Sequence, residues 1–166
     1  MWLGVAIMAF VTAQRLAELG IARQNTDKLL AMGAKEYAPG HYPLIVAVHM
    51  SWLALLWWLA PGREVNWPLM AMFALLQIGR IWVIQTLGPR WTTRIIVLPG
   101  APLVTGGPFH YVRHPNYLVV IGEIAVLPLA FGLCQVAIFF SVLNAIVLAI
   151  RIRAENKALQ VSSPGT

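Results

Sequence analysis

Charge is scarce in this 166-residue sequence. Only 11% of its residues are charged, against about 25% in soluble domains, whereas 59% are hydrophobic and the mean hydropathy is +0.72. This shortage of charge excludes an ordinary soluble domain, and the length suits one domain rather than two. We therefore expect residues 1–166 to form a single membrane domain.

Several other features are missing. The single cysteine, Cys134, excludes an internal disulfide framework and any metal site built from several cysteines. His110 and His114 are four residues apart, but Pro115 breaks helical spacing and no third ligand is nearby, so no metal is predicted. No G-x-G-x-x-G after a strand, P-loop, G-x-S-x-G or H-E-x-x-H occurs, which excludes a soluble Rossmann-type methyltransferase or dehydrogenase.

Long apolar runs are abundant. A spanning helix needs roughly 20 mainly apolar residues, and the first run lacks the basic region and cleavage site of a signal peptide. The run after 116 is too long for one helix, and Pro128 with Gly132 predicts that it divides into a tight hairpin. The sequence predicts an all-α, polytopic membrane protein with five helices, at about 2–22, 43–60, 67–87, 117–131 and 134–153.

Basic residues are distributed unevenly around these helices. The segments 23–42, 88–116 and 151–166 together hold nine Lys and Arg residues, whereas the opposite side holds only Arg63. The positive-inside rule then places the N-terminus outside and the C-terminus in the cytoplasm. The same rule accounts for the net charge of +6. The sequence contains no basic run with interleaved aromatic residues, so a nucleic-acid partner is not expected.

Two polar clusters fall on the predicted cytoplasmic side. In RHPNY, 113–117, proline is favoured as the first residue of a helix, and a helix start favours an anion. An equally simple interpretation is a helix start at the membrane surface, with Arg113 against lipid phosphates. In RIRAENKAL, 151–159, Arg151 and Glu155 share one helix face. They could form a surface salt bridge, or Glu155 could bind the amine of a ligand.

Ionisable residues also occur within the apolar runs. They suggest function by default, but pairing such as Arg80 with Glu123 would explain them structurally, and we favour that interpretation. Arg15 and Arg80 could also extend to the interface. Trp52, Trp57, Trp58 and Trp67 are expected to form an interfacial belt. The ionisable residues concerned are Arg15, Glu18, His49, Arg80 and Glu123.

These motifs resemble a known family. TGGPFHYVRHPNY followed by RIRAENKAL resembles the isoprenylcysteine carboxyl methyltransferase family of integral membrane enzymes. QRLAELGIARQN, GAKEYAPGHYPLIVAVH and GPRWTTRIIVLPGAPLV are similar to its bacterial alkylpyrone O-methyltransferase branch. The resemblance implies a five-helix enzyme of the bacterial inner membrane that binds S-adenosylmethionine with its C-terminal half.

The resemblance also implies roles for particular residues. Arg151 would face the substrate, and Glu155 would bind the amino-acid end of the cofactor. Phe109 stands where tyrosine is usual, and Asn156 stands where the family often has a second acid. The implied cofactor-binding residues are Ala101, Pro102, Leu103, Val104, Phe109, His114, Pro115, Asn116, Tyr117 and Glu155.

The expected function follows from this resemblance. It is methylation of an oxygen, in a carboxylate or an acidic enol or phenol, on a lipophilic acceptor that arrives from the bilayer. The acceptor could be an alkylpyrone-like polyketide or a prenylcysteine-like compound. Alternatives are a phospholipid N-methyltransferase, a nicotinamide-dependent sterol reductase of a related branch, or a non-catalytic scaffold or transporter subunit. Besides the acceptor, membrane lipids are the expected partners.

Overall fold

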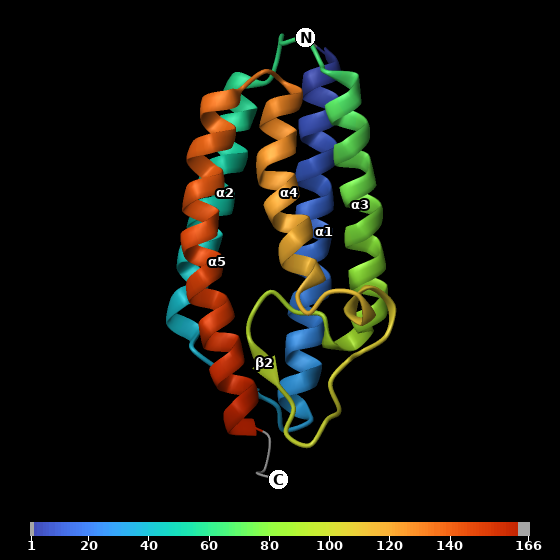
Figure 1. Ribbon diagram of the computed structural model, residues 1–166, viewed down its shortest axis with the longest axis vertical. Helices are drawn as coiled ribbons and strands as arrows, with labels where there is room; N and C mark the ends of the chain where they lie inside the picture. Colours follow the sequence, from blue (N-terminus) through green and yellow to red (C-terminus); the bar gives the residue numbers. More distant parts are fainter. Residues whose placement is uncertain (1, 163–166) are drawn as a thin grey trace.

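The molecule is an elongated bundle of helices (Figure 1). The computed structural model describes residues 2–162. Within them, five α-helices confirm the all-α prediction, and a two-stranded sheet of two residues per strand accompanies them. The helices are α1 (Trp2–Ala31), α2 (Tyr42–Leu59), α3 (Trp67–Leu87), α4 (Pro115–Ala130) and α5 (Cys134–Ser162).

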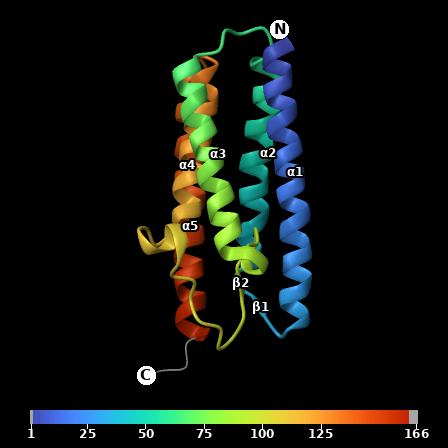
Figure 2. The ribbon, with the colours of Figure 1, turned by 90° about the vertical axis from the view of Figure 1, so that its right-hand side faces the viewer.

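Four of these helices are long and apolar enough to cross a membrane, counted over residues 2–162, and they are α1, α2, α3 and α5. The fourth in sequence, α4, has only 16 residues. Figures 1 and 2 show that α4 begins part-way along the bundle, beside α3. Its start therefore lies inside the bundle, and the segment before it covers that end of the molecule.

Two helices are longer than the sequence predicts. α1 continues to Ala31 instead of ending near residue 22, and α5 continues to Ser162 instead of 153. Hydropathy marks only the apolar part of a helix. Residues 23–31 are mostly polar, but they contain no Pro or Gly that would end the helix. α1 ends where Gly33 adopts a φ of 90°, and Gly33 and Ala34 donate hydrogen bonds to the Leu30 and Leu29 carbonyls. This is the Schellman arrangement, which favours glycine.

The predicted hairpin between the last two helices is present. α4 ends at Ala130 and α5 begins at Cys134. Gly132 has a φ of 70°, and Leu133 donates to the Pro128 carbonyl at 2.9 Å. Asn66 caps α3 by accepting from the Leu69 N–H, and its own N–H donates to the Ala130 carbonyl. The two turns at this end of the bundle are thus joined.

The segment between α3 and α4 is irregular and covers the opposite end. It contains η2 (Gly88–Arg90), β2 (Ile96–Val97) and η3 (Gly107–His110). β2 pairs antiparallel with β1 (Lys35–Glu36), which follows α1, while η1 (Pro39–His41) leads into α2. The pairing holds the segment 91–95 against the ends of α1 and α2. No sequence pattern predicted this small sheet.

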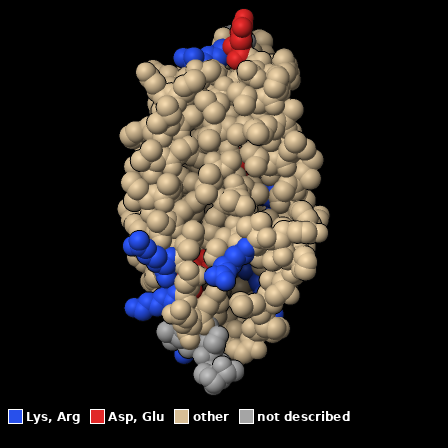
Figure 3. Space-filling view, in the orientation of Figure 1, with Lys and Arg blue, Asp and Glu red and all other residues tan. Residues whose placement is uncertain are grey.

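Charged side chains gather at the two ends of the bundle (Figure 3). On the face shown, most Lys and Arg side chains lie toward the end where α5 finishes. The α2–α3 turn at the other end carries Arg63 and Glu64, both exposed. Trp58 and Trp67 are exposed, as an interfacial belt requires, but Trp52 is fully buried and donates to the Ile124 carbonyl, so it belongs to the core.

Candidate active site

The start of α4 brings the RHPNY motif into the bundle. Pro115 is the first helical residue, as predicted, because proline lacks the N–H that would have no partner there. The His114 carbonyl accepts from the N–H groups of Tyr117 and Leu118. The His114 ring stacks on the Tyr117 ring, with 5.3 Å between centroids. Tyr117 is consequently buried one turn into the helix and faces α5.

Tyr117 lies between Arg151 and Glu155. Arg151 Nε donates to the Tyr117 hydroxyl at 2.9 Å, and that hydroxyl donates to Glu155 Oε2. Arg151 is buried and Glu155 is half-buried. Among the described residues no direct ion pair joins the arginine to the glutamate. The two side chains share a helix face, as predicted. They are linked by hydrogen bonds to the Tyr117 hydroxyl and do not form a surface salt bridge with each other.

The irregular segment after α3 completes this arrangement. Arg151 Nη1 donates to the Thr93 carbonyl at 2.7 Å, and the Thr93 hydroxyl lies 3.2 Å from the Tyr42 hydroxyl. Arg94 sits over the Tyr42 ring and pairs with Glu36 at 3.2 Å. The segment is therefore fastened to α2, α5 and β1. Arg151 keeps further N–H groups available, since a guanidinium has five.

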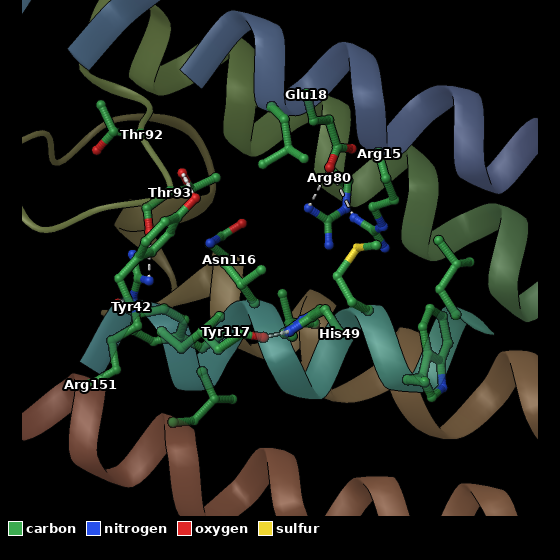
Figure 4. A pocket seen from close by; sticks show the side chains of 18 of the residues that line it. Arg15, Glu18, Tyr42, His49, Arg80, Thr92, Thr93, Asn116, Tyr117 and Arg151 are labelled. Atoms are coloured by element: carbon green, nitrogen blue, oxygen red, sulfur yellow. Dashed lines mark hydrogen bonds and ion pairs between the residues drawn. The ribbon is translucent and has the colours of Figure 1, made fainter. Parts of the chain in front are cut away.

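Two cavities of about 170 Å³ each meet at these residues. The first lies among all five helices and has mainly apolar walls, including Ile45, Met50 and Leu53. The second lies beneath the irregular segment and has a mixed lining, in which charged groups such as Arg90, Arg94 and Glu155 accompany apolar side chains such as Phe109. Five residues line both cavities, namely Trp91, Thr92, Asn116, Tyr117 and Arg151. Figure 4 labels the last four of them around the first cavity.

Two buried polar atoms in this shared wall lack partners. Asn116 Oδ1 and Trp91 Nε1 form no hydrogen bond with any residue of the described chain. An unpaired buried polar atom is costly and therefore rare. An acceptor and a donor left free where two cavities meet are typical of a place where a ligand supplies the missing partners.

The far end of the first cavity holds a charged network (Figure 4). Glu123 accepts from Arg80 Nε at 2.8 Å, from Arg80 Nη2 and from Arg15 Nη2 at 2.7 Å. Glu18 accepts from Arg15 at 2.9 Å and from Arg80 at 3.2 Å. The predicted pairing of Arg80 with Glu123 is confirmed. Both guanidiniums are held by carboxylates inside the bundle, so neither extends to the interface.

Most residues implicated by the sequence meet around the second cavity. Its lining includes Phe109, His114, Pro115, Asn116, Tyr117, Arg151 and Glu155. Ala101, Pro102, Leu103 and Val104 line neither cavity. They lie in the loop between β2 and η3, where Arg90 donates to the Pro102 carbonyl. Their contact with a cofactor stays a prediction.

Sequence reasoning missed part of the site. Trp91, Thr93 and Tyr42 were not singled out, and neither were the aliphatic residues that form the apolar walls of the first cavity. Trp91 and Thr93 act from an irregular segment, where no periodicity marks a residue as buried. The nearest signal was the WTT sequence directly after the Gly-Pro-Arg that follows α3.

Comparison with known proteins gives one family and two relatives. The family model described as "Isoprenylcysteine carboxyl methyltransferase (ICMT) family" matches residues 69–161, which cover most of α3, the irregular segment, α4 and nearly all of α5. An uncharacterized protein of Bacillus subtilis (strain 168), YpbQ, is 40% identical over 172 residues, with 96% of each chain covered. An uncharacterized protein of Haemophilus influenzae is 28% identical, with 91% of each chain covered. No solved structure matches the chain.

Proposed function

Because this chain belongs to the isoprenylcysteine carboxyl methyltransferase family, we propose that it transfers a methyl group from S-adenosylmethionine to an oxygen of a lipophilic acceptor. Family and apolar helices together support a membrane methyltransferase. The wall shared by the two cavities is the observation that supports the choice of donor and acceptor. A water-soluble donor and a lipophilic acceptor need adjoining cavities of unlike character, because their reacting atoms must approach to about 3–3.5 Å.

The second cavity has groups that suit S-adenosylmethionine. Glu155 would hold its ammonium group, and the start of α4 at Pro115 would favour its carboxylate, because a helix N-terminus attracts anions. The unpartnered Asn116 Oδ1 suits a positively charged sulfur nearby. Phe109 and Ile95 offer apolar surface for the adenine ring. When bound, the cofactor supplies a methyl group on an already activated sulfonium. By family resemblance, residues 101–104 are included among its contacts.

The other cavity suits a lipophilic acceptor. Leu19 of α1 and Val46 and Met50 of α2 line it and are also exposed, so it reaches the outer surface between these two helices. In a bilayer that surface faces acyl chains. An acceptor could therefore reach Arg151 laterally while its aliphatic part stays among apolar side chains.

Arg151 is the proposed catalytic residue. Its guanidinium lines both cavities, and the Tyr117 hydroxyl and the Thr93 carbonyl fix its position. A carboxylate or an acidic enol or phenol arrives ionised, so no strong base is required. Arg151 would hold that anion, and the buried wall around it would exclude water. A phospholipid amine is less suited, because a buried guanidinium repels an ammonium group.

Binding of S-adenosylhomocysteine in detergent tests the proposal. A ligand at 100 times its Kd should stabilise the fold by about 2.7 kcal/mol. We expect the thermal unfolding temperature to rise with this ligand and to stay unchanged with adenosine at the same concentration. Radiolabelled S-adenosylmethionine should then label a membrane lipid extract. Absence of stabilisation by S-adenosylhomocysteine at any concentration would contradict the proposed reaction and favour an alternative that does not use this cofactor.

A further inference from the structure

The charged network has more hydrogen-bonding capacity than its own members use. Arg80 directs its Nε, one Nη1 and one Nη2 proton to Glu123 and Glu18, which is three of the five N–H groups of a guanidinium. Arg15 directs two to the same carboxylates. Glu123 lies behind the cavity wall, whereas Arg15, Glu18 and Arg80 line the cavity itself. Donors are thus presented to whatever occupies its far end.

His49 adds an acceptor to these donors. Its Nδ1 donates to the Ile45 carbonyl at 2.8 Å, which leaves Nε2 of the neutral ring as an acceptor. His49 lines the same end of the cavity as Arg15 and Arg80 (Figure 4). The far end of the apolar cavity therefore has a hydrogen-bond acceptor on His49 and unused N–H donors on Arg15 and Arg80. Such an end suits a polar group of the ligand and not the end of an alkyl chain.

The charge balance decides which polar group fits. Two arginines and two glutamates cancel, so a further charged group would be buried without a counter-ion, which is costly. A hydroxyl group both donates and accepts. It could donate to His49 Nε2 and accept from a guanidinium, which satisfies both kinds of group at once.

The helices give the distance between the two polar ends. Tyr42, beside Thr93, and His49 are seven residues apart on α2, which corresponds to about 10 Å at 1.5 Å per residue. Asn116 and Glu123 are also seven residues apart on α4, again about 10 Å. Apolar side chains such as Leu53 and Val120 line the space between. Two helices therefore give the same separation.

We propose that the apolar cavity selects acceptors that carry a neutral hydroxyl group about 10 Å from the oxygen that is methylated. The cluster of Arg15, Glu18, His49 and Arg80 recognises that hydroxyl, while Arg151 holds the reacting oxygen. The inference rests on the proposed function for the identity of the reacting end. Recognition of the hydroxyl itself needs no cofactor.

A matched pair of probes tests the proposal. 8-Hydroxyoctanoate carries a carboxylate and a terminal hydroxyl at a comparable separation, and octanoate lacks only the hydroxyl. We expect the purified protein in detergent to bind the hydroxylated probe roughly 2- to 10-fold more tightly, as one neutral hydrogen bond allows. His49→Phe should abolish this preference, so that the variant binds the two probes with similar affinity. His49→Gln, which retains an acceptor, should restore part of it.

The controls separate this idea from the proposed function. His110→Phe, at an exposed residue of η3 that lines neither cavity, should keep the full preference. Equal binding of the two probes to the unaltered protein would overturn the proposal, as would a His49→Phe loss of equal size for both. The titrations are made without S-adenosylhomocysteine. A protein that prefers the hydroxyl but does not bind S-adenosylhomocysteine would retain this inference and refute the methyltransferase proposal.

Discussion

The Tyr117 hydroxyl explains a glutamate that is placed against local preference. Arginine four residues before glutamate is the weaker order of an ion pair on a helix. Glu155 instead accepts from Tyr117, which accepts from Arg151. The carboxylate is therefore oriented by α4 while one of its oxygens stays available to the second cavity. The unfavourable order on α5 fits a role toward a ligand.

Glu155→Gln tests that role. If the carboxylate binds the cofactor ammonium, the variant loses a charge-assisted hydrogen bond worth about 1.5–3 kcal/mol. We expect the affinity for S-adenosylhomocysteine to fall roughly 10- to 150-fold, while the amide oxygen still accepts from Tyr117 and folding survives. Titration in detergent measures the change. Glu64→Gln, at the exposed α2–α3 turn, is the matched control. Equal affinities of the two variants would remove Glu155 from the site.

Arg151→Lys tests the reacting end. Lysine keeps the charge but loses the planar fork, which Arg151 uses on Tyr117 and Thr93 together. Single-turnover methyl transfer should therefore fall at least tenfold, whereas binding of S-adenosylhomocysteine should change by less. Arg153→Lys, on the exposed side of the same helix, should leave both unchanged. A variant that loses binding and turnover in equal proportion would make Arg151 a cofactor residue.

Among the elements, the helices could be predicted from the sequence and the irregular segment could not. Apolar runs mark all five helices, and Pro128 with Gly132 marks the hairpin. The helix ends were misplaced because polar residues such as Gln24 and Lys28 continue α1 outside any apolar run. The meeting of Tyr117 with Arg151 depends on how α4 packs against α5. The place of Thr93 depends on a two-residue strand pairing, which carries almost no sequence signal.

The charged network joins α1, α3 and α4 by polar contacts. Gln77 of α3 also donates to Glu123, at 2.8 Å. Removing one partner of a buried ion pair leaves the other charge uncompensated and costs about 3–5 kcal/mol, whereas replacing both by apolar residues is often neutral. The pairing of Arg80 with Glu123 could be predicted. The participation of Arg15 and Glu18 could not, because it requires the rotation of α1.

A double-mutant cycle tests this structural role. Arg80→Met and Glu123→Leu should each destabilise the protein by about 3–5 kcal/mol. The double variant should be closer to the unaltered protein than either single variant, since Arg15 and Glu18 remain paired with each other. Thermal and denaturant unfolding in detergent measure the three variants. Additive losses would mean that Arg80 and Glu123 stabilise the bundle separately.

At the scale of the whole molecule, the two cavities open toward different surroundings. The second lies beneath the basic end of the bundle, where α5 finishes, and the first reaches the apolar side between α1 and α2. A soluble donor and a lipophilic acceptor could thus approach the shared wall from water and from lipid. This division of access requires the basic end to face the compartment that contains the donor.

The membrane orientation is the remaining prediction. The N-terminus and the α2–α3 turn lie at one end of the bundle, and the end of α5 lies at the other (Figure 1). Nine basic residues in the segments at the α5 end, against Arg63 at the other, predict that the α5 end is cytoplasmic.

Labelling of introduced cysteines tests this orientation. Cys134, the single native cysteine, is first replaced by serine, and one cysteine is then introduced at Glu64 or at Lys157, which are both exposed. A membrane-impermeant thiol reagent should label the Glu64→Cys variant in intact spheroplasts, and the Lys157→Cys variant only after lysis. The reverse pattern would place the donor cavity outside the cytoplasm, where S-adenosylmethionine is not made, and would contradict both the orientation and the proposed reaction.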